Sequence, residues 1–367
     1  MRIRFYNARI LTMLDGENII TGEVHTDGDA ITYVGGATDK AGEDAQAGVF
    51  DREIDCRGNL LMPGFKNAHT HSGMTFLRSS ADDLPLDEWL NTQVFPYEAK
   101  LTADDIYKLT RLAILEYLSG GTTAAMEMYL TPESIAKAAN EMGFRMVQVG
   151  CINNFSQSVE LIEKYYNTLN GVSDLTSFAL GIHAEYTCSR ELIGEIVALA
   201  AKYRAPVYAH ISETAKEVEE CRGRYGMSPV AFLASEGLFD YGGAGYHLVH
   251  TDAEDIRILK ERGIGVVTNP GSNTKLASGI APISDYLEAG LTVAIGTDGP
   301  ASNNCLDMFR EMFLTTGLAK LRENSACAVP AFDVLTMATR GGADASGRRE
   351  TTGKAGAGQD RNEGHAG

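Results

Sequence analysis

The chain has 367 residues, of which 44% are hydrophobic and 22% charged, a composition typical of a globular protein with a sizeable core. Its formal net charge is −17 and it has no basic patch, so neither nucleic acid nor an anionic membrane surface is expected as a partner. The sequence has no apolar run of the ~20 residues that a membrane span needs, no signal-peptide pattern and no CxxC pair, so we expect a reduced, cytoplasmic location.

Residues 1–59 predict a small β domain. Segments 2–13, 20–36 and 52–64 alternate polar and apolar residues and are separated by Gly and Asp, which favours short strands. We expect these strands to form a small, incomplete β-sandwich.

Residues 60–345 predict a (β/α)₈ TIM barrel, a fold of the α/β class. From residue 60 onward about eight short apolar runs alternate with amphipathic helical segments, as in such a barrel. Segment 102–120 is typical of these helices, with a Thr at its start and a Gly at its end. An open doubly wound sheet is the alternative, but the glycine-rich turn that marks that fold does not follow the first run.

Residues 346–367 are polar and glycine-rich and differ in texture from the barrel. We expect this atypical C-terminal tail to be flexible and to leave the small β domain with an uncovered edge.

Metal-binding residue types fall at the ends of the apolar runs. His69 and His71 are one residue apart at the end of the first run, so in a strand they would point to the same side. His210 ends the fifth run and Asp298 the eighth. A lone histidine there is more often a hydrogen-bonded core residue, but a barrel brings all these strand ends to one rim. Three imidazoles and one carboxylate predict a divalent cation, with zinc ahead of iron or manganese.

Other titratable residues lie near the same rim. Glu213 follows His210 by three residues at the start of a helix. It could simply favour the helix N-terminus, but a proton shuttle at this place would be worth about 10²–10⁴ in rate. A bound zinc ion would lower the pKa of water to roughly 7, which supplies the nucleophile. His183, His247 and His250 are also at run ends.

Four motifs, in this order, resemble the amidohydrolase superfamily: "PGFKNAHTHSGM", "AHISET", "GYHLVH" and "GTDGPASNN". "ADDLPLDEWL" and "VFPYEAKLT" are similar to its cytosine deaminase-like branch, which deaminates 5′-methylthioadenosine and S-adenosylhomocysteine. The resemblance covers residues 1–342 and implies one metal ion held by the four residues His69, His71, His210 and Asp298.

The resemblance also implies roles for the residues around that ion. Glu213 would shuttle protons and also contact the substrate, while His247, with Asp298, would act on the attacking water. Glu98 would bind the ribose hydroxyls and His183 the nucleoside, with Trp89 lining the pocket. The structural alternatives are a core aromatic for Trp89 and a solvated charge for Glu98, and His250 is expected to be structural.

The predicted function is hydrolytic deamination of an adenine nucleoside, of the 5′-methylthioadenosine, S-adenosylhomocysteine, adenosine or 5′-deoxyadenosine type. Water attacks C6, ammonia leaves and the inosine analogue remains. The expected partner is this small molecule, and homo-oligomerisation is left open. Two alternatives stay open: the same machinery on guanine, 8-oxoguanine, a pterin or a chlorinated triazine, and a non-catalytic ligand-binding remnant.

Overall fold

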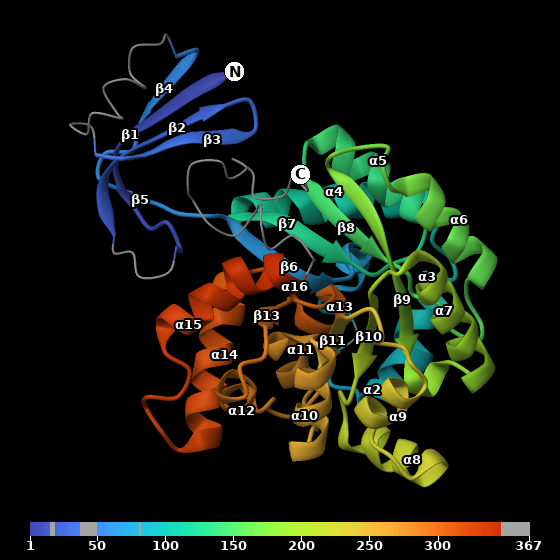
Figure 1. Cartoon of the computed structure of the whole chain (residues 1–367). Helices are drawn as coiled ribbons and strands as arrows, with labels where there is room; N and C mark the ends of the chain where they lie inside the picture. The colour runs from blue at the N-terminus through green and yellow to red at the C-terminus, as the bar shows by residue number, and fades with distance from the viewer. Residues whose placement is uncertain (15–18, 37–49, 81, 346–367) are drawn as a thin grey trace.

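The computed structural model describes residues 1–14, 19–36, 50–80 and 82–345. Figure 1 shows a small N-terminal sheet beside a larger barrel with helices around it. The small sheet has the strand order β3-β2-β1-β4, with β5 also paired to β1. It is mixed, because β1 pairs antiparallel with β2 but parallel with β4 and β5. Its strands are β1 (Arg2–Ile10), β2 (Ile20–Asp27), β3 (Ala30–Gly35), β4 (Arg52–Asp55) and β5 (Leu60–Leu61).

The small sheet has a core of its own, which includes Ala8, Ile10, Val24 and Ile31. Within the described residues this part of the chain is one mixed sheet, and the second layer of the expected sandwich is not among them. The tail 346–367, predicted to be flexible, lies outside the described residues.

The larger part is the predicted barrel. Eight parallel strands follow one another in chain order: β6 (Phe65–Thr70), β7 (Thr122–Glu127), β8 (Arg145–Val149), β9 (Thr176–Ala184), β10 (Val207–Ile211), β11 (Gly243–His247), β12 (Ile264–Thr268) and β13 (Val293–Ile295). The last strand meets the first, since the Asp298 N–H donates to the His69 carbonyl at 3.0 Å and the Thr297 N–H to Asn67 Oδ1 at 2.9 Å.

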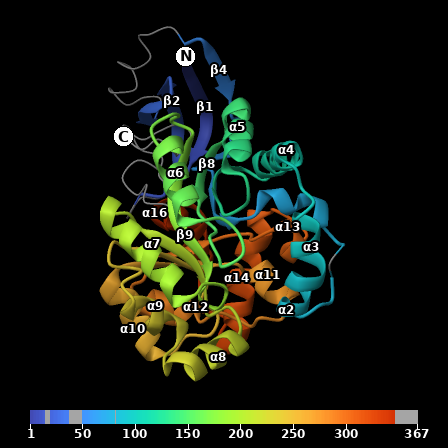
Figure 2. The ribbon, with the colours of Figure 1, turned by 90° about the vertical axis from the view of Figure 1, so that its right-hand side faces the viewer.

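Helices surround this barrel (Figure 2). They are α2 (Leu86–Trp89), α3 (Phe95–Glu98), α4 (Ala103–Ser119), α5 (Pro132–Met142), α6 (Val159–Leu169), α7 (Arg190–Tyr203), α8 (Ala215–Tyr225), α9 (Pro229–Ser235), α10 (Ala253–Arg262), α11 (Pro270–Lys275), α12 (Ile283–Glu288), α13 (Pro300–Asn303), α14 (Met308–Glu323), α15 (Ala331–Thr336) and α16 (Gly342–Ala345). Short 3₁₀ or π turns complete the set: η1 (Ser72–Leu77), η2 (Leu90–Val94), η3 (Glu185–Thr187) and η4 (Met337–Gly341).

Helix α4 forms where the sequence predicts it, for the predicted reason. Thr102 is its N-cap and makes a reciprocal capping box with Asp105, and Gly120 ends it. Such caps satisfy the backbone N–H groups that the first turn leaves without partners. None of the described helices is both long enough and apolar enough to cross a lipid bilayer.

The barrel interior closes beneath the rim where the histidines lie. A buried cluster that includes Ala68, Val149, Tyr208 and Tyr246 fills it. The Tyr246 ring stacks on the His69 imidazole with centroids 3.8 Å apart. This packing closes the barrel interior below the rim.

Candidate metal centre and active site

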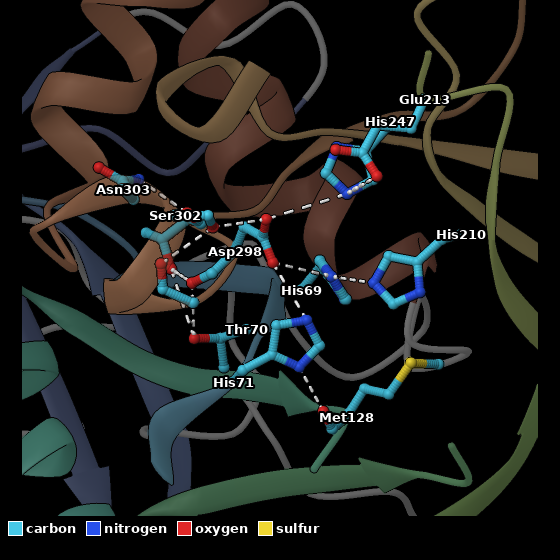
Figure 3. Close-up of polar contacts among 12 residues, drawn as sticks. His69, Thr70, His71, Met128, His210, Glu213, His247, Asp298, Ser302 and Asn303 are labelled. Atoms are coloured by element: carbon cyan, nitrogen blue, oxygen red, sulfur yellow. Dashed lines mark hydrogen bonds and ion pairs between the residues drawn. The ribbon is translucent and has the colours of Figure 1, made fainter. Parts of the chain in front are cut away.

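Four side chains far apart in the chain meet at the carboxyl ends of the barrel strands (Figure 3). Asp298 Oδ1 lies 3.4 Å from His69 Nε2 and 3.1 Å from His71 Nε2. His210 Nε2 lies 3.1 Å from His69 Nε2. The structure thus brings together the four residues that the sequence suggests as metal ligands, and all of them are buried.

His247 reaches the same cluster from β11. Its Nε2 is 3.9 Å from Asp298 Oδ2 and 3.8 Å from Glu213 Oε2. Potential ligand atoms of His69, His210, His247 and Asp298 all lie within 4.8 Å of one another. This group shares three members with the predicted set, so the spacing of the atoms leaves His71 and His247 as alternatives for the fourth position.

Hydrogen bonds on the far side of three imidazoles turn their Nε2 atoms toward the cluster. Nδ1 of His71 pairs with the Met128 carbonyl. Nδ1 of His210 pairs with the His183 carbonyl at 2.7 Å, and Nδ1 of His247 with Asn273 Oδ1 at 2.8 Å. Since carbonyl oxygens only accept, each Nδ1 carries a proton, and Nε2 is the atom of each ring left to bind a cation. Such bonds orient histidine ligands in metal sites, so the donor set fits a divalent cation.

The electrostatics of the cluster agree with this fit. Burial lowers the pKa of His210 well below its usual value, and its imidazole neighbours add to the effect. Burial would raise the pKa of Asp298, but His69 and His71 hold that pKa well below the usual range. Asp298 is therefore ionised, as a cation ligand must be. Burial disfavours the charged form of His71, but the bond to Asp298 raises the pKa of His71 to about 9, so a cation binding there would displace a proton from His71.

The turn after β13 holds Asp298. This residue has a φ of 58°, in the left-handed region that non-glycine residues rarely adopt. The Thr70 hydroxyl donates to its carbonyl at 3.1 Å, and the Ser302 hydroxyl donates to its Oδ2 at 2.8 Å. The segment "GTDGPASNN" thus supplies both the carboxylate and a group that orients it.

Glu213 lies beside the cluster in the loop between β10 and α8. Its carboxyl is buried, and burial raises its pKa. The Ser278 hydroxyl donates to its Oε1 at 3.3 Å. His250 lies beyond the end of β11, where its Nε2 bonds the Ser278 carbonyl at 2.6 Å. This contact supports the structural role expected for His250.

A cavity of about 370 Å³ opens from the cluster. Trp89, Glu98 and His183 line it, together with His71, His210, Glu213, His247 and Asp298. Within the described part of the chain, neither the indole Nε1 of Trp89 nor Oε1 of Glu98 has a hydrogen-bond partner, although both atoms are buried. Burial raises the pKa of Glu98. Buried polar atoms normally have partners, and a molecule in the cavity would be placed to supply them.

Sequence reasoning missed two buried carboxyls that support the site. Glu127, at the end of β7, accepts the Ser72 N–H through both oxygens at 3.0 Å, and burial raises its pKa to about 7. Glu217 accepts backbone N–H groups of the loop that carries Glu213. The signal for Glu127 was a charged residue inside the apolar run "TTAAMEMY", whereas Glu217 carried no signal because first-turn glutamates are common on surfaces.

Comparisons with known proteins agree with this geometry. The model of the amidohydrolase family matches residues 60–360. The 5-methylthioadenosine/S-adenosylhomocysteine deaminase of Thermoanaerobacter pseudethanolicus is 40% identical over 353 residues, which are 94% of this chain and 80% of that protein. The deaminase of the same name from Syntrophobacter fumaroxidans is 42% identical over 354 residues, with 93% and 79% covered.

A solved structure extends the likeness to three dimensions. The adenosine deaminase from Xanthomonas campestris, with bound zinc, has a TM-score of 0.89 at 33% identity and covers 97% of this chain and 82% of its own. The resemblance seen in the four sequence motifs is confirmed: the chain belongs to the amidohydrolase family.

Proposed function

We propose that this protein is a metal-dependent hydrolytic deaminase of adenine nucleosides, of the 5′-methylthioadenosine, S-adenosylhomocysteine, adenosine or 5′-deoxyadenosine type. The observation that carries the proposal is the buried cluster of imidazoles and one carboxylate at the end of a cavity of about 370 Å³. A cavity of this size fits a small ligand such as a nucleoside. Relatives about 40% identical are named for this activity, which supports the choice of substrate.

His69, His71, His210 and Asp298 are the residues we assign to one divalent cation. The zinc in the Xanthomonas campestris neighbour favours zinc, while iron and manganese accept the same ligand types. A cation bound there supplies a Lewis acid that makes hydroxide available near neutral pH. We assign His247 to the attacking water rather than to the cation, because its Nε2 lies as close to Glu213 as to Asp298.

Glu213 performs the proton transfers. Burial raises the pKa of Glu213, which favours its protonated form, and Glu213 delivers a proton to the ring nitrogen beside C6 as water adds there. This transfer neutralises the charge that builds up on the ring. His247 and Asp298 orient the water and take up the proton that it loses, which passes to Glu213 and from there to the amino group. As the C6–N bond breaks, the hydroxyl proton on C6 returns to Glu213, which is thereby restored to its starting state. Ammonia leaves and the inosine analogue remains.

The rest of the cavity holds the nucleoside. Glu98 offers a buried carboxyl oxygen to the ribose hydroxyls, and His183 and Trp89 lie along the same cavity. Ribose hydroxyls can donate to this carboxyl oxygen, and a free base has no such hydroxyls. Glu98 therefore favours a nucleoside over a free base.

Purified, zinc-loaded protein tests the proposal. Ammonia release is measured with 5′-methylthioadenosine, S-adenosylhomocysteine, adenosine and guanine, alongside the metal content. We expect about one metal per chain and turnover of at least one adenine nucleoside. Turnover of guanine alone would show that the enzyme deaminates another ring system. Nucleoside binding without bound metal or turnover would show a non-catalytic binding protein.

A further inference from the structure

The loop that carries Glu213 is strained. Ser212, directly before Glu213, has a φ of 53°, in the left-handed region that non-glycine residues rarely adopt. Such a conformation persists only where the surrounding structure holds it. The direction of the Glu213 side chain therefore depends on whatever fixes this loop.

Glu217, in the first turn of α8, accepts hydrogen bonds from the backbone of this loop. One of its carboxylate oxygens accepts the Ser212 N–H at 2.7 Å and the other accepts the Glu213 N–H at 2.8 Å. Glu217 is 4% exposed, so water does not compete for these bonds. Both oxygens of the buried Glu217 carboxyl group thus bond the two residues that place the Glu213 side chain.

Helix capping alone does not require this arrangement. In α10 the equivalent residue, Asp255, completes an ordinary capping box by accepting the N–H of the N-cap, Asp252, at 3.1 Å. In α8 the N-cap is Thr214, whose hydroxyl accepts the Glu217 N–H at 3.1 Å. Glu217 also accepts the N–H groups of Ser212 and Glu213, the two residues before this N-cap, and among the described residues Asp255 has no counterpart to these two bonds.

The same loop is also tied to the strand end that carries His247. The Ser212 carbonyl accepts the N–H groups of Val249 at 3.0 Å and His250 at 2.9 Å. The Ser212 backbone thus joins the support under Glu213 to the loop after β11. A shift of this peptide would move Glu213 relative to His247.

We infer that Glu217 is a positioning residue for the proton-transfer step: it fixes the loop so that the Glu213 carboxyl faces His247 and the cavity. The inference rests on the proposed function, in which Glu213 transfers the protons. Glu217 lies behind the loop and is not among the residues that line the cavity, so it acts through Glu213 and not on the substrate.

The test is Glu217→Gln, with Asp255→Asn as the matched control. Glutamine keeps one acceptor but turns an NH₂ group toward the other backbone N–H, so one bond is lost at constant size. We expect kcat to fall about 30-fold while KM stays within about threefold, since small displacements of a catalytic group cost rate rather than binding. Metal content should stay at the wild-type level. Asp255→Asn removes a comparable capping bond at a residue that does not line the cavity, and should leave kcat unchanged.

A second measurement separates positioning from general destabilisation. In a Glu213→Gln background, assayed at high enzyme concentration for residual turnover, Glu217→Gln should cause no further loss, because both changes act on one step. If Glu217→Gln does not fold, Glu217→Asp, which keeps both acceptors on a shorter side chain, takes its place in both measurements.

Two results would overturn the inference while nucleoside turnover stands: wild-type kcat in metal-replete Glu217→Gln, or an equal loss of rate with and without the Glu213 side chain. Absence of turnover of every nucleoside by wild-type protein would instead refute the proposed function, and with it this inference.

Discussion

Two buried clusters of histidine and carboxylate lie in different parts of the molecule, and they differ in what neutralises the carboxylate. In the small sheet, His25 Nε2 lies 2.7 Å from Glu23 Oε2, and the Arg4 guanidinium donates two further bonds to that carboxylate at 2.7 Å. In the barrel, Asp298 faces imidazoles, and the residues lining the adjoining cavity include neither lysine nor arginine. The first cluster is neutralised by the chain itself, whereas the second is built to receive an added cation.

The largest effect should come from removing an imidazole of the barrel cluster. His210→Ala takes away a donor whose Nε2 points into the site. We expect zinc binding to be lost and nucleoside turnover to fall by at least about 10³-fold, since the lowered water pKa depends on the bound ion. Metal analysis and ammonia release measure the two effects. Full activity in the metal-free variant would contradict the assignment.

Glu213→Gln should separate proton transfer from metal binding. The change keeps the size of the side chain but removes the proton that it passes, so kcat should fall about 10²–10⁴-fold. Bound zinc should stay close to the wild-type stoichiometry. A variant that retains its activity would show that another group shuttles the proton.

Arg4→Ala tests the cluster in the small sheet. It removes the cation from the small-sheet cluster and leaves the carboxylate of Glu23 buried beside His25. We expect a loss of about 2 kcal/mol in the free energy of unfolding, the usual size for hydrogen bonds to a charged group. Thermal melting measures this loss, and kcat should not change. A drop in zinc content or kcat would mean that the two clusters are coupled.

Another buried carboxyl, Glu311, gives stability a pH dependence. Burial raises the pKa of Glu311 to about 7, although it accepts bonds from Asn303 and the Gly271 N–H. Its ordinary pKa is 4.5. Between these values the folded protein holds a proton that the unfolded chain has lost, so stability falls as pH rises through that window.

The slope from one such group is about 1.4 kcal/mol per pH unit. Glu311→Gln removes the proton that the folded state holds at this site. The melting temperature of the variant should therefore decline less steeply between pH 5 and 7 than that of the wild type. Melting curves of both proteins in one buffer series provide the measurement. An unchanged slope would show that Glu311 is ionised in the fold.

Local sequence predicts much of this fold. The caps at Thr102 and Gly120 bound α4 as expected, because helix ends depend on nearby backbone groups. The alternation of apolar runs with helices predicts the barrel, because each run must be buried on both faces. His69, His71, His210 and Asp298 follow from this scheme, since a barrel places all its strand ends at one rim.

Tertiary structure decided what the sequence left open. The sequence alone leaves Trp89 open to a role as a core aromatic and Glu98 to a role as a surface charge. Only the placement of α2 and α3 along the cavity buries Trp89 and the Oε1 atom of Glu98 there. The support of Glu213 by Glu217, and the approach of His247 to Asp298, likewise arise from chain folding. Strand formation depends on neighbouring residues along the chain, so the sequence pattern alone predicts which residues lie at the rim. Burial and contact depend on segments far apart in sequence, which only packing brings together.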